Sequence, residues 1–411
     1  MSKLKQISII ALILVLFTGC FDDTDQMKLS NVTLHLEVDN LAKAKLTGLK
    51  VKLNNTSDNT VRQFPLDENA TVIFENLVYG RYNLSFNHSV KDSKIKVDSV
   101  FNGVLNDLLV FEDDTVIMPI DTAIQKKDFV LSEIYTAGID YNVLYKDAYF
   151  EVFNGTNDTL YLDGLHYAQL AGSMGSDAND EVFFAPVGEY VYAQRVCKIP
   201  GNGKDYPVAP QEYRLVSMNA INFKEAYDPY NPFGFTEDSY LDLTIADFET
   251  FPEEYMNGKG FEYNPHFHVD NPDVPDVEVL YIVDLRDWSL FIPGVGATSA
   301  IIFRPEGELD VNDVVTKNPF DETPLWYVRI PSETIIDGVD FLYNSESAKF
   351  KRLPSDVDVS FTSLTPEHSK NFTGMSVSRK KEIDANGLIK LKDTNNSAED
   401  FETLKIPTPR Y

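Results

Sequence analysis

Cysteine is scarce in this 411-residue chain, which has only Cys20 and Cys197. Two cysteines allow at most one internal disulfide, and none if either thiol is used otherwise. The stability of the folded chain must therefore come from hydrophobic cores. The length is sufficient for two or three domains with cores of their own.

Basic residues are also in deficit. The chain has 36 lysines and arginines against 64 aspartates and glutamates, which gives a formal net charge of −28 at pH 7. A protein with this charge is repelled by nucleic acid and by anionic lipid head groups. We therefore expect no nucleic-acid partner.

The motifs of common enzyme classes are missing from the sequence. It contains no G-x-S-x-G elbow, no H-E-x-x-H, no P-loop and no dinucleotide-binding glycine pattern. Cys197 lies in "AQRVCKIPG", at a predicted strand end without a cue for a catalytic base, and we expect a small buried hydrophobe there. The chain is predicted not to be an enzyme, so no catalytic residue is assigned.

Only the beginning of the chain carries a long hydrophobic run. Two lysines precede an apolar stretch, residues 7–17, which is too short for a transmembrane helix and has the layout of a secretion signal. It closes as Leu-x-x-Gly-Cys and resembles the lipobox of bacterial lipoproteins. This resemblance implies that residues 1–19 are removed and that Cys20 is acylated, and more than one acyl chain would make the anchor stable. An ordinary signal with a chance cysteine is the alternative.

Acidic residues follow Cys20 at once. Asp22 and Asp23 lie two and three positions after it, in a tether over residues 20–28. Acids at these positions resemble the export signal that sends lipoproteins of the Bacteroidetes to the outer face of their outer membrane. We therefore expect a lipid-anchored protein of the outer membrane that faces the cell exterior. A tether that is merely polar is the simpler interpretation.

Residues 29–122 are predicted to form strands. "VTLHLEV" alternates apolar and polar residues with a period of two, and "LKVKLNN" and "ATVIFENL" repeat this pattern. With "VYGRYNLSF", these segments resemble the carboxypeptidase regulatory-like, or prealbumin-like, β-sandwich. Modules of that family are generally spacers or docking surfaces without catalytic activity.

Residues 128–411 are predicted to form a second domain. "DAYFEVFN" and "TLYLDGLHYAQL" resemble the lamin-tail β-sandwich, and "GMSVSRKKEIDANG" resembles its closing segment. A loop-rich insertion, about residues 172–325, separates the two ends. The predicted fold is therefore mainly β, with two Ig-like or prealbumin-like β-sandwiches, of which the second is lamin-tail-like and carries the insertion.

The combination of these features resembles a family of Bacteroidetes lipoproteins known as domain of unknown function 4876. Its members tend to occur with TonB-dependent outer-membrane transport. The resemblance therefore implies an outer-membrane β-barrel as partner, such as a TonB-dependent transporter, and it supplies no catalytic residue.

Metal ligation is the first of two candidate binding chemistries. If "NPHFHVDN" is extended, His266 and His268 share a face, with Asp270 next along, and could bind a transition metal. The competing interpretation is a polar loop strand. Oxygen ligands also cluster in "ELDVNDVV", "DVDVS" and "DANG", which allows a structural Ca²⁺, although none reproduces an EF-hand loop. We assign no other cofactor.

An aromatic loop is the second candidate. "EAYDPYNPFGF" places Tyr227, Tyr230, Phe233 and Phe235 in a turn-rich segment with two prolines. Rigid aromatic side chains provide good contact area for a sugar, a peptide or a protein. The competing interpretation is that these rings form a satellite core.

Three functions are compatible with these features. The leading hypothesis is a non-enzymatic cell-surface lipoprotein that assists an outer-membrane β-barrel, either a TonB-dependent transporter or assembly machinery, and binds a partner or ligand through its loops. The second is a structural or adhesive envelope protein stabilised by Ca²⁺. The third is a hydrolase with a site in the insertion.

Overall fold

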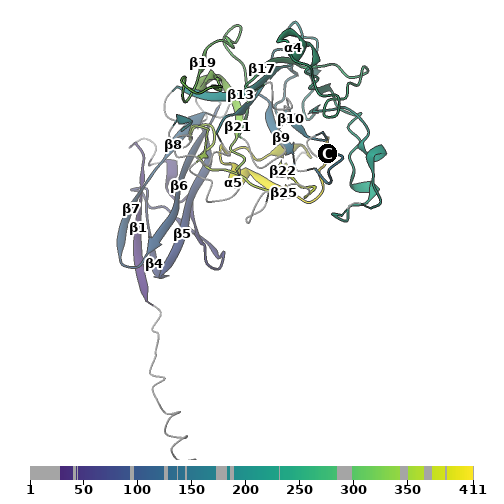
Figure 1. Ribbon diagram of the computed structural model, residues 1–411. Helices are drawn as coiled ribbons and strands as arrows, with labels where there is room; N and C mark the ends of the chain where they lie inside the picture. The colour runs from purple at the N-terminus through teal and green to yellow at the C-terminus, as the bar shows by residue number, and fades with distance from the viewer. Residues whose placement is uncertain are drawn as a thin grey trace, which may run out of the picture. The chain divides into compact units, whose positions relative to one another are not determined.

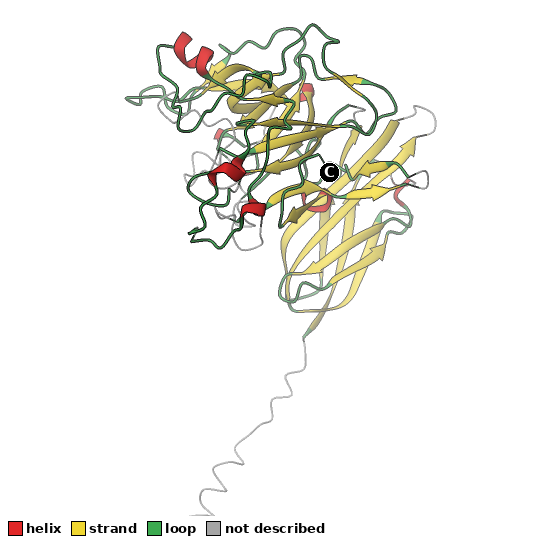
Figure 2. Ribbon diagram, turned by 90° about the vertical axis from the view of Figure 1, so that its right-hand side faces the viewer, coloured by secondary structure: helices red, strands yellow, loops and turns green. Residues whose placement is uncertain are grey.

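Strands dominate the computed structural model, and its helices are few and short (Figure 2). This confirms the prediction of a mainly β protein. None of the helices in the described part of the chain is long and apolar enough to span a bilayer. The structure describes residues 28–39, 43, 45–92, 97–124, 128–136, 138–143, 146–172, 183–185, 189–230, 232–284, 299–342, 350–364, 373–384 and 387–410.

The predicted signal and the start of the tether, with Cys20, Asp22 and Asp23, lie outside the described residues. The chain divides into two compact units. The first takes residues 1–86 and 104–119, and the second takes residues 87–103 and 120–411. The division therefore cuts through β5 (Gly80–Asp92) and β6 (Val97–Val110).

The first unit has two groups of paired strands. β1 lies between β4, to which it is antiparallel, and β7, to which it is parallel (Figure 1). β3, β2 and β5 are neighbours in that order. Buried and less buried side chains alternate along β1, as its sequence predicts, because only one of its faces meets the core. These strands are β1 (Leu29–Glu37), β2 (Lys50–Asn55), β3 (Val61–Pro65), β4 (Thr71–Val78) and β7 (Asp114–Pro119).

The second unit holds two larger sheets. Their strand orders are β16-β15-β10-β9-β22-β25 and β19-β20-β13-β12-β18-β21, with β17 paired to β13. Their bounds are β9 (Val130–Tyr135), β10 (Tyr149–Phe153), β12 (His166–Leu170), β13 (Tyr190–Lys198), β15 (Tyr213–Ser217), β16 (Phe248–Glu249), β17 (Glu278–Ile282), β18 (Ala300–Phe303), β19 (Val314–Val315), β20 (Tyr327–Pro331), β21 (Ile335–Val339), β22 (Ser376–Arg379) and β25 (Phe401–Leu404).

Shorter elements complete the second unit. β11 pairs with β14, β23 pairs with β24, and β8 pairs with β6. The remaining elements are β8 (Asp121–Ile124), β11 (Leu160–Tyr161), β14 (Pro207–Val208), β23 (Lys381–Ile383), β24 (Ile389–Leu391), the 3-10 helices η1 (Phe223–Ala226), η2 (Glu237–Ser239) and η3 (Ser332–Thr334), and the helices α4 (Glu253–Gly258) and α5 (Ser397–Asp400).

The two larger sheets share one core. Its buried cluster contains Val152 from β10 together with Ile302 from β18 and Val339 from β21. The rings of Phe150 and Tyr167, one from each sheet, stack with their centroids 3.9 Å apart. Burial of each such side chain contributes roughly 1.5–3 kcal/mol, so this shared core supplies much of the stability of the unit.

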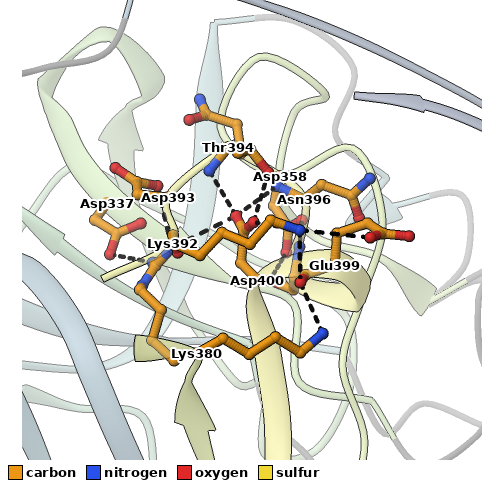
Figure 3. Close-up of polar contacts among 12 residues, drawn as sticks. Asp337, Asp358, Lys380, Lys392, Asp393, Thr394, Asn396, Glu399 and Asp400 are labelled. Atoms are coloured by element: carbon orange, nitrogen blue, oxygen red, sulfur yellow. Dashed lines mark hydrogen bonds and ion pairs between the residues drawn. The ribbon is translucent and has the colours of Figure 1, made fainter. Parts of the chain in front are cut away.

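A buried charge network lies at the end of β22 (Figure 3). Arg379 is 2% exposed, and its guanidinium lies 2.6 Å from Asp337, 3.1 Å from Asp393 and 3.6 Å from Asp400. Its Nε also donates to the carbonyl oxygen of Leu131 at 2.9 Å. A planar guanidinium with five donors suits this many acceptors, so Arg379 holds β9, β21 and the segment before β25 together.

Candidate functional site

The aromatic loop, residues 223–241, is closed at its base. The amide of Phe223 donates to the carbonyl oxygen of Leu241 at 2.9 Å, and that of Leu243 donates to the carbonyl oxygen of Ile221 at 3.0 Å. The side chain of Asn222 caps η1 by accepting a hydrogen bond from the amide of Lys224. The loop is therefore fixed at both ends by backbone hydrogen bonds.

Two of the four predicted aromatic residues anchor the loop. Tyr227 and Phe235 are partly buried and pack against the core cluster of the second unit. The Tyr227 ring meets Tyr240 edge to face at 5.5 Å, and the buried Tyr240 donates its hydroxyl to Asp140. For Tyr227 and Phe235 the satellite-core interpretation is therefore the better one.

The other two aromatic residues face solvent. Tyr230 is 88% exposed and Phe233 is 39% exposed. The carboxylate of Asp228 accepts a hydrogen bond from the amide of Tyr230 at 2.8 Å, which fixes the turn that carries the ring. The Phe233 ring lies 5.7 Å from that of Tyr141, which is 70% exposed and comes from a distant part of the sequence. We call Tyr141, Tyr230 and Phe233 the aromatic patch.

A cavity of about 560 Å³ opens beside the base of the aromatic loop. Its volume lies within the range of about 300–1,000 Å³ that is typical of ligand sites. The lining includes Asn142, next to Tyr141 in sequence, and Ala226, next to Tyr227. Polar groups on its wall are Lys146, Asn222, Glu225, Thr244, Asp270 and Asn271.

The acidic cluster consists of Glu249, Asp270 and Asp276, with one carboxylate oxygen of each within 4.8 Å of the others. Oxygens at this spacing are the ligand type that Ca²⁺ prefers. The buried Glu249 accepts hydrogen bonds from the amides of Ala220, at 2.7 Å, and Asn271, at 2.5 Å. These bonds stabilise Glu249 without an ion. Asp270 and Asp276 also line a second cavity of about 630 Å³.

The predicted arrangement of His266, His268 and Asp270 is not formed. Residues 265–267 form a turn rather than a strand, because the side chain of Asn264 accepts a hydrogen bond from the amide of His266 at 2.9 Å. His266 is exposed whereas His268 is buried, so the two imidazoles do not share a face. Asp270 is the one member of this set that joins the acidic cluster.

In each oxygen-rich stretch that was considered for Ca²⁺ binding, a carboxylate accepts hydrogen bonds from the protein itself. Asp313 of "ELDVNDVV" pairs with Arg329, whose Nε lies 2.9 Å away. Asp358 of "DVDVS" accepts a hydrogen bond from the amide of Ser397 at 2.9 Å, and Asp384 of "DANG" accepts one from an amide of its own turn at 2.9 Å. Their roles in the structure are therefore accounted for by the fold itself.

Several carboxyls of the second unit are buried, and burial raises their pKa values. The pKa of Asp147 rises to about 8, and those of Glu151 and Glu249 rise to about 7. A carboxyl with a higher pKa in the folded than in the unfolded chain binds its proton more tightly when folded. Between the pKa of the unfolded chain and that of the folded chain, the carboxyl is ionised in the unfolded state but protonated in the folded state. The free energy of unfolding therefore falls as the pH rises through this range.

We therefore expect the melting temperature to be higher at pH 5.5 than at pH 8, by at least about 3 °C. Asp147→Asn should reduce this difference, because asparagine does not titrate. Its amide oxygen can still accept the hydrogen bond of the Tyr135 hydroxyl, which lies 3.0 Å from the Asp147 carboxylate. Glu306→Gln, at an exposed position, is the matched control and should leave the difference unchanged. Thermal unfolding followed by circular dichroism measures all three proteins. A wild-type melting temperature that increases from pH 5.5 to pH 8 would contradict the prediction.

Comparisons with known proteins agree on one family. Residues 209–408 match the family model described as "Protein of unknown function (DUF4876)". The fold is similar to the crystal structure of a DUF4876 family protein from Bacteroides thetaiotaomicron VPI-5482, with a TM-score of 0.53 and 24% identity, over 91% of this chain and 94% of that chain. Among curated proteins, none matches the chain.

Proposed function

We propose that this protein is a non-enzymatic cell-surface lipoprotein that assists an outer-membrane β-barrel. Its residues 209–408 match the DUF4876 family model. The observation that carries this proposal is the aromatic patch. Tyr230 and Phe233 are exposed on a loop that is closed at its base, and the exposed Tyr141 contacts Phe233. A loop whose backbone is already fixed loses less conformational entropy on binding than a flexible one. The patch is therefore the proposed docking surface for the barrel.

The proposal extends to the type of each module. The first unit is assigned to the carboxypeptidase regulatory-like, or prealbumin-like, β-sandwich, and the alternation of buried residues along β1 supports this assignment. The second unit is assigned to a lamin-tail-like β-sandwich with a long insertion, supported by the pairing of β9 with β22 and by the core shared between its two larger sheets. Scaffolds of this type can present loops for binding without supplying chemistry themselves.

The start of the sequence supports the proposed location. The lipobox-like residues 16–20 would anchor the chain through Cys20, and Asp22 and Asp23 would direct it to the outer face of the outer membrane. The tether of residues 20–28 can span at most about 30 Å when fully extended. The first unit would therefore remain close to the membrane surface, where a β-barrel is accessible.

The docking surface is tested by replacing both exposed rings. The lipoprotein is purified in mild detergent and the co-purifying proteins are identified by mass spectrometry. We expect wild type to recover a β-barrel and Tyr230→Ala/Phe233→Ala to recover at least about tenfold less, because central interface aromatics commonly contribute 1–2 kcal/mol or more. The melting temperature should change by less than about 2 °C, since single surface substitutions typically have small effects.

Phe320→Ala is the matched control, because Phe320 is 93% exposed and follows an Asn-Pro pair in the same unit. It should leave barrel recovery unchanged. Recovery of the lipoprotein alone from wild-type cells would contradict the proposed function. A drop of several degrees in the melting temperature of the double variant would show that Tyr230 and Phe233 are core residues.

A further inference from the structure

The segment that contains the aromatic loop has an unusual excess of acidic residues. Between residues 219 and 277 the sequence has thirteen aspartates and glutamates against two lysines, Lys224 and Lys259, and no arginine. The whole chain has 64 acidic and 36 basic residues, so the imbalance is much stronger in this segment. Such a segment attracts cationic groups and repels anionic ones.

Two of these carboxylates lie in the aromatic loop itself, shortly after Phe233 in the sequence. Glu237 and Asp238 form the first turn of η2, and both are exposed. Within the described residues, neither side chain makes a hydrogen bond or an ion pair. By contrast, Asp228 is engaged with the amide of Tyr230. Glu237 and Asp238 therefore remain available to a partner.

Exposed rings and nearby carboxylates together favour a particular type of cation. A small metal ion is bound by oxygen ligands and gains little from exposed phenyl and phenol rings. Lysine and arginine side chains use both features, because the charged group lies over a ring face while it pairs with a carboxylate. The second unit contains this arrangement already, where the Arg329 guanidinium lies 5.0 Å from the centre of the Tyr190 ring and pairs with Asp313.

We infer that the aromatic patch, with Glu237 and Asp238, is a docking surface for a lysine- or arginine-rich protein segment. This inference rests on the proposed function, since it gives the chemistry of the partner at the same surface. The exposed rings supply contact area and cation–π attraction, and the two carboxylates supply ion pairing. Binding should therefore weaken as salt concentration rises, because exposed charges are screened.

The test uses the mature full-length chain and a fluorescein-labelled hexa-arginine peptide, with fluorescence anisotropy at 50 and 300 mM NaCl. A labelled hexaglutamate peptide is the control for the sign of the charge. Wild type should bind hexa-arginine, with weaker binding at the higher salt concentration, and should not bind hexaglutamate. Glu237→Gln/Asp238→Asn should weaken hexa-arginine binding at least about fivefold, as expected for the loss of two charge contacts.

Glu306→Gln/Glu308→Gln is the matched variant, because it removes the same charge from exposed positions elsewhere in the second unit. It should change the affinity less than about twofold, since distant surface charges are screened. Equal weakening by both pairs would overturn the inference, because binding would then follow net charge alone. Absence of hexa-arginine binding to wild type would overturn it as well.

The same variants separate this inference from the proposed function. If Tyr230→Ala/Phe233→Ala abolishes barrel recovery while Glu237→Gln/Asp238→Asn affects neither the barrel nor the peptide, the docking patch stands and its preference for cations is wrong. If hexa-arginine binds with the expected pattern but no barrel is recovered, the chemistry of the surface is supported and the β-barrel partner is wrong.

Discussion

Replacing Arg379 with methionine is expected to lower the free energy of unfolding by about 3–5 kcal/mol, because it leaves the buried carboxylate of Asp337 without its cation. The guanidinium lies within 3.6 Å of Asp337, Asp393 and Asp400, and methionine fills much of the same volume without any donor. The carbonyl oxygen of Leu131 also loses its hydrogen bond from Nε. Urea unfolding followed by tryptophan fluorescence measures the change.

Acidification should partly rescue this variant. Burial raises the pKa of Asp400 to about 6 even with the guanidinium present, so protonation near pH 5 removes negative charge that the arginine no longer neutralises. The control is Arg329→Met, which removes a solvent-screened pair with Asp313 and should lower the free energy of unfolding far less. If Arg379→Met changes the free energy of unfolding as little as the control does, the buried network is not what holds β22 in place.

Replacing Cys20 with serine is expected to remove nearly all of the protein from the membrane fraction. A serine hydroxyl cannot form the thioether that a lipoprotein anchor requires, and a single chain on the amine would bind a membrane only marginally. The chain should then be found unprocessed or in the soluble fraction. Cell fractionation and the mass of the N-terminal peptide provide the measurement.

The acids that follow Cys20 should control which face of the membrane carries the protein. Asp22→Asn/Asp23→Asn should leave the anchor intact but reduce digestion by protease added to intact cells. Asp25→Asn is the control, since it neutralises an acid of the same tether outside these two positions. Full digestion of the double variant would show that the acids form only a polar tether.

The strands of this protein could be predicted where one face is buried. Residues 32–38 alternate in hydropathy because the side chains of β1 alternate between the core and the exterior, and this period is visible in the sequence. The strand at Tyr149–Phe153 is different, since all of its residues are buried. The alternation of apolar and acidic positions in "DAYFEVFN" predicts this strand, but it does not mark an exposed face, because Glu151 is buried as well.

The candidate site was predictable only in part. Composition indicated that the segment with Tyr230 and Phe233 carries exposed rings, but Tyr227 and Phe235 belong to the same pattern and pack against the core. Which ring is buried depends on residues such as Tyr240, which the local pattern does not reveal. Tyr141 was missed for the same reason, because a contact across the fold brings it to Phe233.

The closed base of the aromatic loop has a consequence for how this protein can change over evolution. Hydrogen bonds between residues 221–223 and 241–243 join the two ends of the loop, and the side chains of Tyr227 and Phe235 pack against the core. Residues 228–234, between Tyr227 and Phe235, can therefore be replaced or extended by insertions at little cost to folding, since extra residues in a surface loop add only a small closure entropy. The specificity of the proposed docking surface can thus diverge between related proteins while the scaffold beneath it stays the same.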